Sequence, residues 1–139
     1  ADRDWSSDVC SSDLQDLMQT TGITVWIENE NLMDAVTAVS GSGPAYVFLL
    51  AEAMQAAGVA QGLSEDAARA LTNQTLLGAA RMLAETGEPA DVLRQRVTSP
   101  GGTTQAAIES FEAQGFRGIV NNAIEAATQR GRTLSAAND

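Results

Sequence analysis

The architecture of this 139-residue chain can be inferred from one segment, Ser40-Gly41-Ser42-Gly43-Pro44-Ala45-Tyr46-Val47-Phe48-Leu49-Leu50-Ala51. Its Gly-rich half predicts a helix-breaking turn, and Pro44 is tolerated as the first residue of the helix that follows. Residues 45–51 are apolar all round, and a helix without a polar face is buried on every side. The segment therefore predicts a helix that needs cover in every direction.

The sequence after Asn31 is typical of an all-α domain. Ser64 is a good N-cap, and Gly87 and Gly115 suit helix ends. The last helix has an apolar stripe with i, i+3, i+4, i+7 spacing, formed by Phe116, Ile119, Val120, Ala123, Ile124 and Ala127. We predict helices at 32–39, from 44 to about 57, from 65 to about 86, at 89–97, from a cap at Thr103 or Thr104 to Gly115, and from 116 to about 134.

These helices are rich in alanine, and small side chains bury little apolar area at about 25 cal/mol per Å². A domain of this kind is marginal alone. We therefore expect a second copy of the chain to cover residues 45–51, so that the protein is a homodimer. An ordinary monomeric helix bundle is the alternative.

The segment before these helices has a different pattern. Residues 14–20 predict a short helix, and the β-branched and aromatic residues 23–27 predict a strand. A lone strand needs partners, and none is visible downstream. We therefore expect its sheet to lie in sequence missing from this chain or in another chain.

Residues 1–14 differ again, because residues 4–13 are rich in Ser and Asp and contain the only cysteine. Back-translated, this stretch resembles a sequencing-library adapter read in frame. We expect a non-native leader without structure, in which Trp5 packs on nothing. A disordered acidic leader is the alternative.

The composition excludes several functions. The net charge is −10, from 18 acidic and 8 basic residues, which argues against nucleic acid and against an anionic membrane surface. The chain has no histidine and one cysteine, which excludes His- or Cys-based metal sites and His-dependent nucleophiles. No apolar run approaches the roughly 18 residues of a membrane span. The single cysteine makes a reducing cytoplasm the expected compartment.

One segment is chemically unusual, Val97-Thr98-Ser99-Pro100-Gly101-Gly102-Thr103-Thr104. Its glycines expose backbone N–H groups, and the following helix begins with N–H groups that lack internal partners. Hydroxyl groups lie beside them, so the segment can form a cradle for a small carboxylate or a phosphate. A Gly-rich N-cap turn without a ligand is the alternative. The acidic pair Glu28 and Glu30 could serve acid chemistry or form a solvated turn.

Two motifs carry a resemblance. Residues 34–46 and residues 97–104, the latter followed by Ala107-Ile108 and Phe111-Glu112, are similar to the C-terminal signatures of pyrroline-5-carboxylate reductases. Gly115-Phe116-Arg117 and the closing helix agree with the same family. The resemblance covers the chain from about Leu14 onward.

The resemblance implies an all-α dimerisation domain like the C-terminal domain of 6-phosphogluconate dehydrogenase. Residues 34–139 would form this helical dimerisation and substrate-binding domain. Residues 15–33 would be a short α/β remnant of a missing Rossmann domain that binds the nucleotide. Subunits interlock through the helices, and higher oligomers built from dimers are common in the family.

The implied reaction is reduction of 1-pyrroline-5-carboxylate to L-proline with NADPH or NADH. By motif position, the backbone of Gly102, Thr103 and Thr104 and the hydroxyl of Ser99 would hold the substrate carboxylate. The Thr104 hydroxyl would be the catalytic group, facing the imine nitrogen, and the proton would come from water or through Thr104. Glu30 falls where the family often has a carboxylate near the substrate. A separate pair, Arg96 and Val97, falls near the nicotinamide, although the family has a shorter polar residue at position 96.

Two other interpretations stay open. One is a non-catalytic helical dimerisation module, which this chain would be when isolated from a nucleotide-binding domain. The other is the C-terminal domain of a related dehydrogenase that acts on a hydroxy acid. Those enzymes usually depend on a lysine, and the match at Ser99-Pro100-Gly101-Gly102-Thr103-Thr104 speaks against them.

Overall fold

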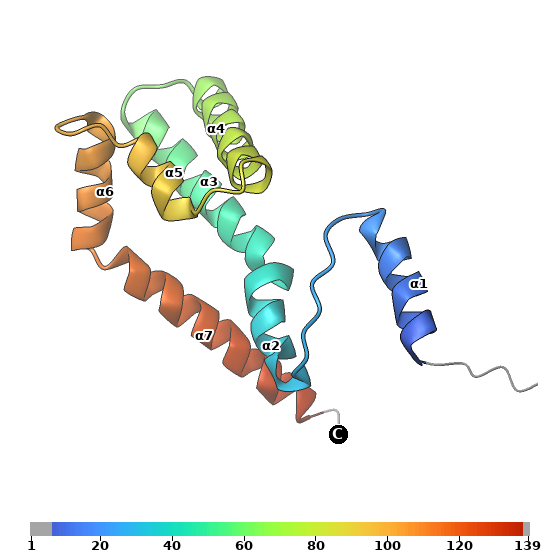
Figure 1. Ribbon diagram of the computed structural model, residues 1–139. Coiled ribbons are helices and arrows are strands. Elements are labelled where there is room, and N and C mark those ends of the chain that lie inside the picture. The colour runs from blue at the N-terminus through green and yellow to red at the C-terminus, as the bar shows by residue number, and fades with distance from the viewer. Residues whose placement is uncertain (1–6, 138–139) are drawn as a thin grey trace, which may run out of the picture. The chain divides into compact units, whose positions relative to one another are not determined.

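A computed structural model describes the backbone of residues 7–137 and the side chains of residues 13–137. This part of the chain contains helices and loops but no strand, which confirms the all-α prediction (Figure 1). The chain divides into two units, Ala1–Met33 and Asp34–Asp139. The elements are α1 (Ser7–Gln19), η1 (Glu30–Leu32), α2 (Met33–Val36), η2 (Thr37–Gly41), α3 (Gly43–Ala60), α4 (Glu65–Glu85), α5 (Ala90–Arg96), α6 (Thr103–Ala113) and α7 (Phe116–Ser135).

The helix of the first unit begins earlier than predicted. The expectation that residues 1–14 form a leader without structure is wrong for residues 7–14, which form the first part of α1. Serine and aspartate are favoured at helix starts, which is compatible with this composition. Residues 1–6, and the side chain of Trp5 with them, lie outside the described part. The origin of the leader stays a prediction.

Residues 23–27 do not form the predicted strand. A strand needs a hydrogen-bonded neighbour, and the described residues supply none, so the β-branched composition has no ladder to join. The segment is connected to α1 instead, because Trp26 Nε1 donates a 2.8 Å hydrogen bond to Gln15 Oε1. Its assignment to a dinucleotide-binding domain stays a prediction.

The Gly-rich segment does not break the helix as predicted. The helical backbone continues through α2 and the π-helical turn η2, and Ser42 keeps α-helical dihedral angles (φ −85°, ψ −19°) before α3. The Ser42 N–H donates to the Thr37 carbonyl, five residues earlier, at 2.8 Å. In a continuous α-helix the Pro44 ring would clash with the carbonyl of Ser40. A π turn inserts one residue and relieves that clash. Pro44 is the second residue of α3, after Gly43, and not the first as predicted.

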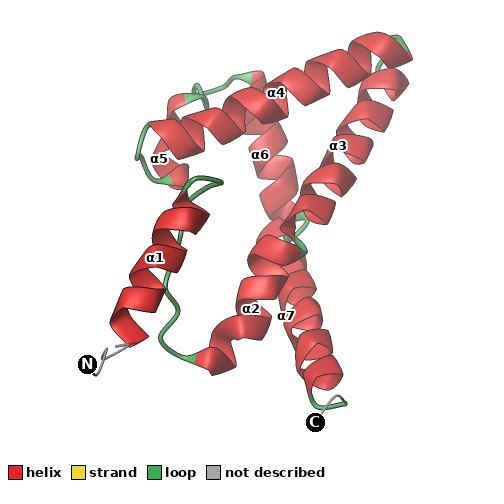
Figure 2. Ribbon diagram, turned by 90° about the vertical axis from the view of Figure 1, so that its right-hand side faces the viewer, coloured by secondary structure: helices red, strands yellow, loops and turns green. Residues whose placement is uncertain are grey.

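A helical hairpin is formed by α3 and α4 (Figure 2). Ser64 caps α4 as predicted, because its Oγ accepts the Ala67 N–H at 3.3 Å. A Cβ at Gly58 would lie 3.3 Å from the Cβ of Ala68. Ala68 itself is 2% exposed. Small residues therefore set the close approach of the two helices.

Glycines in the left-handed conformation separate the later helices. Gly87 (φ +68°) follows α4 and Gly115 (φ +73°) precedes α7, as predicted. From Gly115, α7 runs back to α2 and η2 (Figure 1). There a Cβ at Gly131 would lie 2.5 Å from Asp34 Oδ1. The lack of a side chain at Gly131 thus allows α7 to lie close to Asp34.

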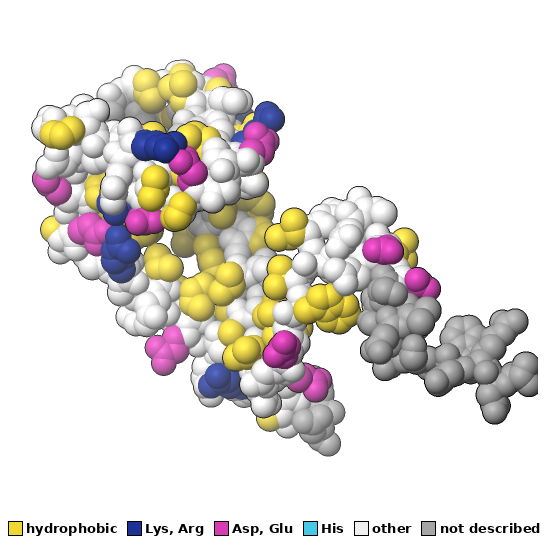
Figure 3. All heavy atoms as spheres, in the orientation of Figure 1, with side chains coloured by type: hydrophobic (Ala, Val, Ile, Leu, Met, Phe, Trp, Pro, Cys, Tyr) yellow, Lys and Arg dark blue, Asp and Glu magenta, His cyan; other side chains and the backbone are white. Residues whose placement is uncertain are grey.

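The core within one chain is small. Among the described residues, the buried side chains are Ala38, Ala68, Thr72 and Leu93. Residues 45–51 are not buried on every side: Phe48 is 68% exposed and Leu49 is 65% exposed. Hydrophobic side chains accordingly lie open on the surface of the second unit (Figure 3). A helix this apolar lacks cover within its own chain.

Candidate functional site

The loop that joins α5 to α6 contains the candidate cradle. It leaves α5 at Val97, and Thr98 ties it back to that helix. The Thr98 Oγ1 donates to the Arg94 carbonyl at 2.6 Å, and its N–H donates to the Gln95 carbonyl at 3.1 Å. The start of the loop is therefore fixed to α5.

Two glycines shape the turn into α6. Gly101 has φ +71°, a conformation that side chains disfavour. A Cβ at Gly102 would lie 3.1 Å from the Ser99 carbonyl oxygen, which is tighter than an ordinary contact. The Gly102 N–H donates to the same oxygen at 3.0 Å. Gly102 is also the N-cap of α6, so the prediction of a Thr103 or Thr104 cap is wrong. A side chain at position 102 would require the Ser99 carbonyl to shift by a few tenths of an ångström.

The first turn of α6 carries donors that no described residue uses. The N–H groups of Thr103 and Thr104 have no hydrogen-bond partner in the part of the chain that the structure describes. They are the orphan groups of a helix start, where the peptide dipoles place partial positive charge. Thr104 is half-buried, whereas Ser99 and Thr103 are exposed. Ser99, Gly102, Thr103 and Thr104 are thus brought together around one turn.

Gln105 completes this turn, and sequence reasoning missed it. Its Oε1 accepts the Gly101 N–H at 2.7 Å, and its Nε2 donates to Glu109 Oε1 at 2.6 Å. The signal was present in the sequence, because glutamine at the third position of a helix commonly reaches back to an N–H before it. Glu109 follows at i+4, one helical turn further.

Arg96 and Val97 lie at the opposite end of the loop. The Arg96 guanidinium forms an ion pair with Glu88, and its side chain is 62% exposed. Val97 is the C-cap of α5 and is 58% exposed. Both side chains are accessible, but Arg96 already has a partner.

Glu30 belongs to the other unit of the chain. It opens η1, whose N-cap Asn29 accepts the Asn31 N–H through Oδ1 at 3.0 Å. The structure brings Ser99, Gly102, Thr103 and Thr104 together within the second unit. Glu30 is not among them.

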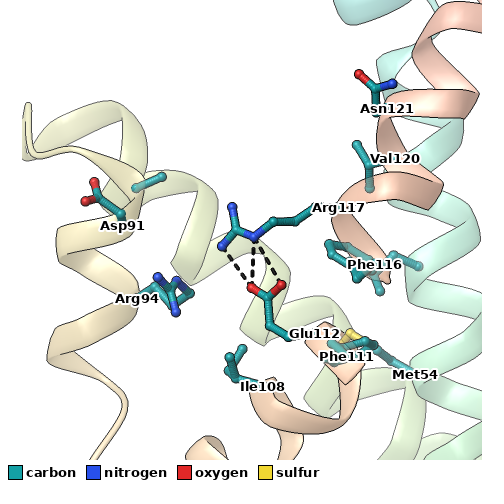
Figure 4. Close-up of a pocket in the computed structure, with 12 residues that line it drawn as sticks. Met54, Asp91, Arg94, Ile108, Phe111, Glu112, Phe116, Arg117, Val120 and Asn121 are labelled. Atoms are coloured by element: carbon teal, nitrogen blue, oxygen red, sulfur yellow. Dashed lines mark hydrogen bonds and ion pairs between the residues drawn. The ribbon is translucent and has the colours of Figure 1, made fainter. Parts of the chain in front are cut away.

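Two apolar grooves lie in the second unit. One, of about 850 Å³, is lined by α3, α5, α6 and α7. At this groove Arg117 reaches from α7 to Glu112 on α6, with Nη2 2.9 Å from Oε1 (Figure 4). The hydrogen bond from Arg117, reinforced by the charges of Arg117 and Arg94, lowers the pKa of Glu112. In turn, the hydrogen bond to Glu112 and the charge of Glu112 raise the pKa of Arg117.

The second groove, of about 420 Å³, lies between α3 and α7. Its α7 wall includes most of the stripe predicted from helical spacing. The lining residues are Tyr46, Val47, Leu49, Leu50 and Ala53 from α3, and Phe116, Ile119, Val120, Ala123 and Ile124 from α7. The spacing argument identified this face correctly, but the face is open within one chain.

Comparison with known protein families assigns the chain to one of them. The family described as pyrroline-5-carboxylate reductase dimerisation matches residues 30–134. The chain belongs to this family. The pyrroline-5-carboxylate reductase of Pseudomonas aeruginosa is 56% identical over 120 residues, which are 86% of this chain and 44% of that protein. The soybean (Glycine max) enzyme is 50% identical over 111 residues, 80% of this chain and 40% of that protein.

Solved structures of pyrroline-5-carboxylate reductases contain a part with the same fold as this chain. The Coxiella burnetii structure has a TM-score of 0.87 at 41% identity and matches 96% of this chain and 49% of that one. The Plasmodium falciparum structure, which contains bound NADP, has a TM-score of 0.80 at 35% identity and matches 95% and 50%. The chain therefore spans less than half the length of the curated relatives it matches, and about half of these solved chains.

The pyrroline-5-carboxylate reductase dimerisation domain begins at residue 30 and so includes the whole loop between α5 and α6. Among the residues whose side chains are described, no group of three or more acidic or cysteine side chains could hold a metal ion. In the same part of the chain, no helix combines the length and apolarity needed to cross a membrane.

Proposed function

We propose that this chain is the dimer-forming and substrate-binding part of an enzyme that reduces 1-pyrroline-5-carboxylate to L-proline. One observation carries the proposal: the signature loop presents two open N–H groups, of Thr103 and Thr104, beside hydroxyl groups. Such a cradle suits a carboxylate, because backbone N–H groups at a helix start bind anions without a cation. Family membership supports the choice of substrate.

The residues of the loop would have distinct roles. The N–H groups of Thr103 and Thr104 and the Ser99 hydroxyl would hold the substrate carboxylate. The Gly102 N–H would be shared between the Ser99 carbonyl and the anion in a three-centre hydrogen bond, a kind that is common at helix termini. The Thr104 hydroxyl would face the imine nitrogen. Glu30 would be a further carboxylate near the substrate.

NADPH or NADH, when bound, supplies the hydride for the imine carbon. The proton for the nitrogen comes from water, directly or through the Thr104 hydroxyl. This chain's own task is to orient a small anionic imine, which loop N–H groups and hydroxyls can do. Arg96 and Val97 are exposed and would border the nicotinamide end of the cofactor. The ion pair with Glu88 would hold the Arg96 guanidinium to one side of the nicotinamide.

The partner would be a second copy of the chain, in a homodimer that can build higher oligomers. The two apolar grooves and the exposed Phe48 and Leu49 are the surface that this copy would cover. The expected compartment is the cytoplasm, since a single cysteine offers no internal disulfide.

A hybrid enzyme tests the proposal. Residues 15–139 would replace the matching segment of the Pseudomonas aeruginosa relative, whose remaining half supplies the rest of the enzyme. We expect the hybrid to oxidise NADPH in the presence of 1-pyrroline-5-carboxylate and to yield L-proline. The 139-residue chain assayed alone is the control without turnover. A folded hybrid that binds NADPH but leaves the substrate unchanged contradicts the proposal.

A further inference from the structure

Gln105 lies just outside the signature loop but is bonded into it. Its Oε1 accepts the Gly101 N–H at 2.7 Å, and its Nε2 donates to Glu109 Oε1 at 2.6 Å. The two bonds define the amide orientation, because only the oxygen can accept and only the nitrogen can donate. The bond to the carboxylate is charge-assisted and therefore stronger than a neutral one. Glu109 thus fixes Gln105, and Gln105 fixes the Gly101 peptide.

This arrangement selects the donors that stay open. The Gly101 N–H is occupied by Gln105, and the Gly102 N–H already donates to the Ser99 carbonyl and could offer the anion only a shared bond. Without the Gln105 side chain, the Gly101 peptide would lose its only tie to α6 among the described residues. Glycine adopts many backbone conformations at little cost, so the released peptide could rotate. The loop at Ser99 to Gly101 would then no longer hold one position relative to the open N–H groups of Thr103 and Thr104, which α6 itself orients.

We infer that Gln105, oriented by Glu109, is a positioning residue for the substrate carboxylate. It holds the Gly101 peptide, and with it the Ser99 side of the loop, in place beside the N–H groups of Thr103 and Thr104 before the anion binds. The inference rests on the proposed function of the loop. A loop that is ordered before binding loses less entropy when the substrate arrives, and the substrate binds more tightly. A helix cap without this role would change stability and leave substrate binding untouched.

Glu109 has two effects of opposite sign, which substitutions can separate. Its hydrogen bond orients Gln105, whereas its negative charge disfavours a nearby carboxylate. Glu109→Gln keeps an oxygen acceptor for Gln105 and removes the charge. Glu109→Leu removes both. If orientation dominates, only the leucine variant weakens substrate binding.

The experiment uses the hybrid reductase. We expect Gln105→Met to raise the KM for 1-pyrroline-5-carboxylate about tenfold, with kcat and the nucleotide KM within about twofold, since a binding contact is lost more than a transition-state contact. Glu109→Leu should raise the same KM, and Glu109→Gln should leave it within about twofold. Gln114→Met is the matched control, because it removes a 3.3 Å bond to the Ser110 carbonyl at the far end of α6. Its KM should equal that of the parent.

The outcomes separate the two hypotheses. An active parent with an unchanged KM in Gln105→Met overturns the positioning role, even if the melting temperature falls. An equal rise of KM in Gln114→Met overturns it too, because the effect would then be general to α6. A parent hybrid that is folded and binds NADPH but is inactive overturns the proposed function itself, and this inference with it. In the 139-residue chain, the Gly101 amide should exchange faster in Gln105→Met, and unchanged exchange contradicts the proposed tie.

Discussion

The Tyr46 hydroxyl donates a 3.0 Å hydrogen bond to the carbonyl of Ala38, from the first turns of α3 back to the π turn. Ala38 is 1% exposed, so water has little access to replace the tyrosine. The bond therefore stabilises the irregular helix at the point where Pro44 requires it. The conformation of the Gly-rich segment depends on a side chain several residues downstream.

Removing that hydroxyl should destabilise the second unit. We expect Tyr46→Phe to lower the free energy of unfolding by about 1–2 kcal/mol, because a buried carbonyl loses a partner and the ring is retained. Urea denaturation of the 139-residue chain measures the change. A difference below about 0.3 kcal/mol would mean that water replaces the hydroxyl.

Gly131 should respond to alanine differently from an unhindered helical glycine. A Cβ at Gly78 in α4 has nothing within 4 Å, so Gly78→Ala should stabilise by about 0.5–1 kcal/mol through helix propensity. At Gly131 the new Cβ would lie 2.5 Å from Asp34 Oδ1, and the Asp34 side chain would have to turn away. We expect Gly131→Ala to gain nothing or to destabilise. An Asp34→Ala background should restore the gain, and a double-mutant cycle measures this coupling.

These contacts show what the sequence can and cannot predict. Helix ends at Ser64, Gly87 and Gly115 follow from local chemistry and were predicted correctly. The π turn was missed, because it depends on how the Pro44 ring meets the preceding turn. The strand at residues 23–27 was wrong, because strand formation requires a partner that local propensity does not supply.

The candidate site was predicted to a similar extent. Composition and family resemblance indicated the loop and its hydroxyl groups. The N-cap was assigned to a threonine, whereas the tight approach of Gly102 to the Ser99 carbonyl makes glycine the cap. The role of Gln105 depends on the orientation of one amide, and a residue type alone does not specify it.

The ion pair between Glu112 and Arg117 should make stability depend on pH. Arg117 lowers the pKa of Glu112 in the folded chain. A carboxyl with a depressed folded pKa stabilises the protein above its unfolded pKa and loses this effect as the pH falls through the folded pKa. We expect Glu112→Gln to be less stable than the parent at pH 7 and equal to it at strongly acidic pH. Thermal unfolding across this range measures it, and a constant difference would contradict the assignment.

The apolar face should control assembly. Leu49 lines the groove between α3 and α7 and is 65% exposed in one chain. Leu49→Glu would place a charge in the proposed interface, where an unpaired buried charge is costly, and we expect the dimer to dissociate at micromolar concentration. Leu71→Glu, on α4 and outside both grooves, is the matched control. Sedimentation equilibrium measures the mass. A compact monomer for the parent chain would contradict the dimer.

The hydroxyl groups of the loop should affect the reaction in different ways, measured in the hybrid reductase. Thr104→Val keeps the shape of the half-buried side chain and removes the hydroxyl proposed to face the imine. A hydrogen bond to a charged or polarised partner contributes about 1.5–3 kcal/mol, so kcat/KM should fall about tenfold to a hundredfold. Ser99→Ala should act mainly through the substrate KM, because its contact would be the same in the ground and transition states. The nucleotide KM should change little in both. A Thr104→Val variant that stays folded and dimeric with kcat/KM within about twofold of the parent would show that the Thr104 hydroxyl has no part in the reaction.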